Sequence, residues 1–159
     1  MGFALLPLAV VLFFAGLTME AMQFASAAPG SGQLARQDSL AAVAALQAEA
    51  FSTACLNAAL ATPGSVSSNI AVALPVGVTA PANAECMTTA GPAGSRYVYS
   101  YVPSVPGEAG QIASDTAMSE LWLRGLGQGN AASLATGQMT TVPATIPAGT
   151  VVQQVLVTP

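Results

Sequence analysis

Few side chains in this sequence could carry out chemistry. It holds seven acids, and its cations are Arg36, Arg96 and Arg124, with no lysine and no histidine. General acid–base catalysis near neutral pH usually recruits a histidine, or a lysine or carboxylate with a shifted pKa, and a serine or cysteine nucleophile here would lack its usual base. Glu108 and Asp115 could share a helix face, but two acids on such a face usually serve only solubility. We therefore expect no catalytic residue and no enzyme.

The scarcity of charged residues and the absence of histidine and lysine also limit which ligands the protein could bind. The segment Gly125–Gly129 (Gly-Leu-Gly-Gln-Gly) superficially resembles a phosphate loop, but it follows a predicted helix and contains no lysine. The acids are scattered and histidine is absent, so neither a calcium nor a zinc site is predicted. Three arginines cannot build the basic surface that neutralises phosphates, which excludes nucleic acid as a partner. The prediction is no cofactor, no metal and no small-molecule substrate.

The two cysteines, Cys55 and Cys86, lie 31 residues apart. An isolated pair in an oxidising compartment most often forms one disulfide. Two buried free thiols are the alternative, because free cysteine is among the most buried residue types.

An aromatic row is the most distinctive chemical feature. In the segment 96–102, Tyr97, Tyr99 and Tyr101 alternate with small or branched residues, which predicts a strand with three rings on one side. Tyrosine is favoured in interfaces, so these rings and the neighbouring Trp122 are candidate partner-binding residues. The alternative is that the rings cover a helix within the domain.

The N-terminal segment is apolar. No charge occurs before Glu20, and Phe3–Leu17, extended through Met22, approaches the roughly 20 residues needed for a membrane-spanning helix. A signal peptide cleaved after Ala27 competes with an uncleaved anchor, but no basic residue precedes the apolar core. We expect residues 1–28 to be a transmembrane anchor and residues 29–159 to form one exported domain.

The elements of that domain follow from periodicity. An alanine-rich helix is predicted over 33–61, a strand over 96–102, a second helix over 108–125, a strand over 149–158 and, less distinctly, a strand over 70–74, while 64–95 is mostly loop. The first helix should bury a face that includes Leu40, Val43, Leu46, Ala50 and Ala54; the second should bury a stripe of Ile112, Ala113, Ala117 and Leu121 with Trp122 beside it. Helices set apart from a small antiparallel sheet give an α+β fold.

Several of these features, in order, resemble a known family. A Met-Gly start, an uninterrupted apolar segment, an alanine-rich helix, the Tyr97-Val-Tyr99 strand, a proline-rich turn and the closing strand Ile146–Val152 resemble PilM, small accessory proteins of type IVb (thin) pilus systems, often encoded with conjugative elements. The resemblance implies a membrane-associated factor in pilus biogenesis without a catalytic site. Its partners would be other pilus assembly proteins and the inner membrane, with the domain in the periplasm.

The start of the chain also leaves a second role open. Met1-Gly2-Phe3 is similar to the junction that prepilin peptidase cuts, but Pro7 stands where the acidic fifth residue of a mature pilin would lie. A minor pilin-like or adhesin-like subunit of the fibre is therefore the alternative to an assembly component. A soluble periplasmic protein, released by cleavage at Ala27, is the alternative for its location.

Overall fold

The computed structural model describes residues 31–158, in which two helices and six strands occur. The predicted α+β class is confirmed, while the apolar N-terminal segment, with its division at residue 28, lies outside the described residues. The chain divides into two units, 1–38 and 39–159; of the first, the structure describes the beginning of α2, where residues 32–38 are all exposed. In chain order the elements are α2 (Ser31–Ala61), β1 (Glu85–Ala90), β2 (Arg96–Pro103), α3 (Glu108–Asp115), β3 (Trp122–Gly127), β4 (Asn130–Ser133), β5 (Met139–Thr141) and β6 (Thr150–Val157).

The six strands form one antiparallel sheet in the order β1-β2-β6-β3-β4-β5. The last strand of the chain is therefore central, pairing with β2 along all eight residues and with the beginning of β3. Both strands of the β2–β6 pair are predicted from the sequence, and the structure confirms them. One half of the sheet packs with α2 and α3 in a core around Phe51, Val98 and Ile112; a second core around Tyr99, Leu123 and Ile146 lies on the opposite face.

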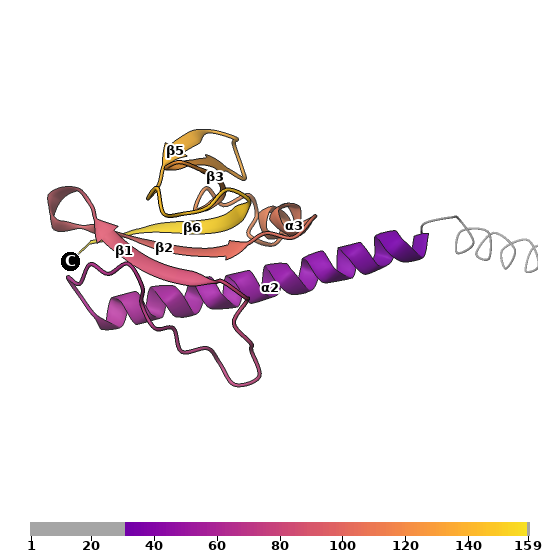
Figure 1. The fold of residues 1–159 in the computed structure, drawn as a ribbon, viewed down its shortest axis with the longest axis horizontal. Helices are drawn as coiled ribbons and strands as arrows, with labels where there is room; N and C mark the ends of the chain where they lie inside the picture. The colour runs from indigo at the N-terminus through magenta and orange to yellow at the C-terminus, as the bar shows by residue number, and fades with distance from the viewer. Residues whose placement is uncertain (1–30, 159) are drawn as a thin grey trace, which may run out of the picture. The chain divides into compact units, whose positions relative to one another are not determined.

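The part of helix α2 from Ala41 to Ala59 packs on the sheet on the side of β1 and β2, and α2 is drawn in violet in Figure 1. The face it buries is not the one expected from the sequence. Leu40, Val43 and Leu46 are 53–67% exposed. The buried residues are mostly small ones on the opposite side: Ala41, Ala45, Ala48, Phe51, Ser52, Cys55 and Ala59. Where the disulfide joins α2 to β1, the Cα atoms of Cys55 and Cys86 lie 5.6 Å apart.

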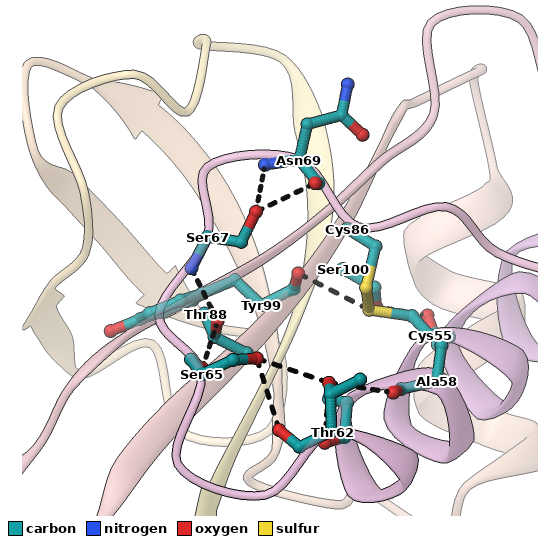
Figure 2. The surroundings of a disulfide bond; sticks show 12 residues. Cys55, Ala58, Thr62, Ser65, Ser67, Asn69, Cys86, Thr88, Tyr99 and Ser100 are labelled. Carbon is teal, nitrogen blue, oxygen red and sulfur yellow. Dashed lines mark hydrogen bonds between the residues drawn. A yellow bond between two sulfur atoms is a disulfide. The ribbon is translucent and has the colours of Figure 1, made fainter.

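Three sets of polar or covalent contacts join α2 to the sheet, and Figure 2 shows the first of them, the disulfide. Cys55 forms a disulfide with Cys86 of β1, and the buried hydroxyls of Ser52 and Ser100 lie 2.6 Å apart in a hydrogen bond. At the end of the helix, the guanidinium of Arg96 donates to the carbonyl oxygens of Ala59 at 2.5 Å and Thr62 at 2.7 Å. The last carbonyls of a helix lack partners within it and carry partial negative charge, so a buried cation there satisfies both needs.

The second helix is much shorter than predicted. It ends at Asp115 instead of continuing to residue 125, and Ala117 and Met118 adopt positive φ angles, which turn the chain back towards the sheet. Residues from Trp122 onwards then form β3, and the glycine-rich segment Gly125–Gly129 forms the end of β3 and its turn into β4. Gly125 is needed in this hairpin, because a Cβ there would lie 2.4 Å from Thr150 Oγ1.

The loop after α2 also differs from the prediction. Residues 70–74 belong to no strand, although Ile70, Val72 and Leu74 pack against the core at alternate positions. The loop instead pairs briefly with β1: Ile70 N donates to Cys86 O, and Thr88 N donates to Ser67 O, both at 2.8 Å. Thr88 Oγ1 accepts from Ser67 N and donates to Ser65 O (Figure 2). Strand β1 has no alternation of polar and apolar residues, so the sequence gives no sign of it.

Candidate interaction site

The tyrosine row lies on strand β2, with its rings on the sheet face opposite α2. Tyr99 is 3% and Tyr101 is 6% exposed, and both belong to the core that includes Met87, Leu123 and Ile146; Tyr97 is half-buried at its edge. Residues 142–146, between β5 and β6, contribute to this core, with Val142 and Ile146 buried. The interpretation of the row as an exposed binding face is therefore wrong for Tyr99 and Tyr101. What covers the rings is sheet and loop, not the helix named as the alternative.

Trp122 does not join the tyrosines. It is the first residue of β3, is 3% exposed, and packs in the core on the α2 side of the sheet with Phe51 and Ile112. Its predicted place on a helix stripe is wrong, because the chain turns at Ala117 and Met118 and β3 pairs with β6. The four predicted partner-binding residues thus belong to two separate cores, and three of them are buried.

The hydroxyl of Tyr101 lies beside a cavity of about 570 Å³ at the end of the sheet. The hydroxyl donates to the exposed carboxylate of Glu85, and the remaining walls come from Asn83, Pro103, Thr145 and residues 147–150. Burial, followed by the hydrogen bond to Glu85 and its negative charge, raises the pKa of Tyr101 to about 12. The phenol therefore stays protonated at neutral pH and acts as a hydrogen-bond donor to Glu85 in the wall of the cavity.

The Tyr101 hydroxyl gives stability a measurable pH dependence. Its pKa in the unfolded chain is about 10, so the folded state retains the proton more strongly, and this contribution is complete below pH 10 and lost as pH rises towards about 12. A shift of this size corresponds to about 3 kcal/mol. In urea unfolding between pH 8 and 12, we expect Tyr101→Phe to make the alkaline loss of stability smaller than in the unchanged protein. Burial also raises the pKa of Tyr99, so part of the alkaline loss of stability should remain in the Tyr101→Phe variant. Tyr97→Phe is the matched control, and an equal effect of both substitutions would contradict this assignment.

The predicted cysteine pair is joined in the structure by a disulfide with 5.6 Å between the Cα atoms. Both residues are at most 1% exposed, and Cys55 Sγ lies 3.6 Å from the carbonyl oxygen of Tyr99. A bond so enclosed is out of reach of reagents in water while the domain is folded. We assign it a structural role, as the covalent link between α2 and the edge strand β1.

The carboxylates of Glu108, Glu49 and Asp115 lie in environments that contribute to the fold. Glu108 is 1% exposed, and its carboxylate accepts a 2.7 Å hydrogen bond from Val105 N in the turn before α3; burial raises its pKa, which that bond partly offsets. Glu49, on α2, has a raised pKa caused by burial and then by the charge of Asp115, and one of its oxygens is buried without a hydrogen-bond partner in the described chain. Glu108 and Asp115, which the sequence places on one helix face, differ in environment, since Asp115 is exposed and accepts from Gln111.

The exposed candidate surface is the side of α2 that faces away from the sheet, which we call the outer face. Its members are exposed or half-exposed: Val43, Leu46, Ala50, Thr53, Asn57 and Leu60. The sequence shows the apolar spacing of this face but not its exposure. The predicted disulfide of Cys55 was the available signal, since a helix residue bonded to the rest of the domain must face it, which places these residues on the other side.

By length and composition α2 could also cross a membrane, since an 18-residue window within Gly32–Ala61 has a mean hydropathy of 1.3. The same criteria fit the core helix of a soluble domain. Residues 45–59 are held to the sheet by Phe51, the disulfide and the buried Ser52, so this part of α2 is a core helix.

Comparison with known proteins gave one structural likeness. No family model and no curated protein matches the chain. Among solved structures, the crystal structure of a protein named PilM from Escherichia coli B7A is similar, with 17% identity and a TM-score of 0.49, covering 74% of this chain and 93% of that one. This chain resembles PilM.

Proposed function

We propose that this protein is a non-enzymatic component of type IV pilus assembly, of the conjugative thin-pilus type. It is anchored in the inner membrane by residues 1–28 and acts through contacts with other pilus proteins in the periplasm. The observation that carries the interaction role is the outer face of α2, where Val43, Leu46 and Leu60 are each at least 50% exposed. The assignment to pili rests on the order of sequence features that resembles PilM.

The surroundings of the carboxylates and the low charge of the chain favour a role in protein–protein contacts over catalysis. The buried carboxylate of Glu108 is engaged by a backbone amide, and Glu85 accepts from the Tyr101 hydroxyl. With so few charges on the chain, recognition has to come from apolar surface and backbone groups, and exposed apolar patches on a folded domain commonly mark interaction sites.

The test is complementation of a host from which the gene has been deleted. We expect the deletion to abolish pili in sheared-fibre preparations and to reduce conjugative transfer, and the full chain to restore both. A version in which residues 1–28 are replaced by a cleavable signal peptide should accumulate in the periplasm without restoring pili, because it is no longer held at the membrane. Unchanged piliation in the deletion strain would contradict the pilus role, and restoration by the soluble version would contradict the anchor.

The same samples separate the alternative role. An assembly component stays in the membrane pellet after an alkaline carbonate wash and is absent from purified fibres. A fibre subunit is recovered in the fibres, with a mature N-terminus at Phe3. Release by carbonate, with an N-terminus at Ala28, would instead identify a soluble periplasmic protein.

A further inference from the structure

From Ser39 to Ala61, helix α2 carries apolar residues on all sides and almost no charge, which is unusual for a helix with one face in water. Between Ser39 and Ala61 its single charged residue is Glu49. The side facing the sheet consists of apolar or small residues, and the outer face of apolar residues with Thr53 and Asn57. A helix that is hydrophobic all round is normally buried all round. In this domain the sheet covers one side of α2 and leaves the outer face exposed.

The outer face has a regular repeat. Its six residues, Val43, Leu46, Ala50, Thr53, Asn57 and Leu60, are separated by steps of three, four, three, four and three. This is the a and d spacing of the heptad repeat by which two helices pack along their length. The residues buried against the sheet, including Ala45, Ala48, Ser52 and Cys55, occupy the c and f positions of the same heptads, on the far side of the helix. The sheet therefore leaves the a and d positions clear for a second helix.

The residue types at these positions indicate which helix that is. Val43 occupies an a position and Leu46 a d position, the combination that favours a parallel pair of helices. Asn57 occupies another a position, where a single polar residue fixes register and a two-stranded state, followed by Leu60 at d. Ala50 and Thr53, in the middle, are small enough for close approach. We propose that α2 is a dimerisation helix, through which two copies of this chain pair in parallel and in register along the outer face.

The low charge of α2 and its attachment to an N-terminal anchor both favour a second copy of this chain as the partner that covers the outer face. With one carboxylate in 23 residues, two copies of this helix meet with little electrostatic repulsion. The parallel orientation rests on the proposed function, because chains that are anchored by their N-terminal segments in one membrane enter the periplasm in the same direction. The contact is short, so confinement to a membrane, which raises the effective concentration of the helices, is what makes the pairing effective.

Cysteine cross-linking of the full chain in its membranes tests this inference. We expect Leu46→Cys and Asn57→Cys each to form a disulfide-linked dimer under mild oxidation, about tenfold more than Ser114→Cys, an exposed position on α3, because in-register pairing brings equivalent a and d residues together. Adding Leu46→Asp to the Asn57→Cys chain should abolish the dimer. Since Leu46 is 62% exposed, that change should leave the domain folded, as judged by far-UV circular dichroism.

Different results would contradict the dimer itself and its parallel arrangement. Equal, weak cross-linking at all three positions overturns the dimer, as does protection of Leu46→Cys from a water-soluble thiol reagent without dimer formation, which would assign the face to lipid or to another protein. Efficient cross-linking only between Leu46→Cys and Asn57→Cys in a mixed sample overturns the parallel arrangement. A carbonate wash of the same membranes reports on anchoring separately, so loss of the anchor is not mistaken for loss of the dimer.

Discussion

Replacing Trp122 with alanine is expected to lower the free energy of unfolding by about 3–5 kcal/mol, the usual range for removing a large buried aromatic side chain. Trp122 is 3% exposed and packs with Phe51 and Ile112, residues from both helices. Truncation would therefore leave a cavity between the sheet and the helices. Urea unfolding followed by far-UV circular dichroism measures the change without relying on the fluorescence of the tryptophan that is removed.

The matched control is Leu126→Ala on the same strand, where the side chain is 44% exposed and the change should stay within about 0.5 kcal/mol. Tyr99→Ala should behave like Trp122→Ala, since its ring is equally buried. If Trp122→Ala kept its stability but lost piliation, the tryptophan would be a partner contact after all, and its place in the core would be contradicted.

Removing the disulfide through Cys55→Ala with Cys86→Ala is expected to lower the free energy of unfolding by about 3–4 kcal/mol. Closing a loop of 31 residues restricts the unfolded chain by that amount in the chain-entropy model. The loss should appear in the urea midpoint.

The control for this pair of substitutions is Ser52→Ala. It removes the hydrogen bond to Ser100 on the same helix face and leaves one buried hydroxyl without that partner, for which about 1–3 kcal/mol is expected. A disulfide effect below that of Ser52→Ala would contradict the role of the bond as the principal link between α2 and β1. Thiol labelling of the unfolded protein with and without reductant tests the bond itself, since equal labelling would mean that it is absent.

The local pattern of the sequence was sufficient for the elements that are regular along their whole length. The alternation in Arg96–Val102 and the apolar run at the C-terminus both predicted strands, because a strand with one partner on each side repeats its environment every two residues. The alanine-rich stretch predicted a helix for a similar reason, since its residues favour helix and no proline or glycine follows Gly32 until Pro63.

The same patterns were insufficient wherever distant residues decide the outcome. Residues 117–125 have the composition of a helix, but β6 offers an unpaired edge to Trp122 and Leu123, and its hydrogen bonds and core contacts exceed the small difference in helix propensity. Strand β1 likewise exists because β2 and the loop residues Ser67 and Ile70 lie on either side of it.

The sequence by itself determined the class of the domain, the absence of a basic surface, and the two strands and the long helix from which the fold is built. Only the tertiary structure decided which face of each element is buried. On α2, periodicity marked Leu40, Val43 and Leu46 as one apolar face, but the residues buried against the sheet are mostly alanine, serine and cysteine on the opposite face. On β2, alternation put three tyrosines on one side, and the return of residues 142–146 over them made a core of a surface that looked available for binding. Periodicity shows which residues share a side of an element; the shape and proximity of its neighbours determine which side they cover.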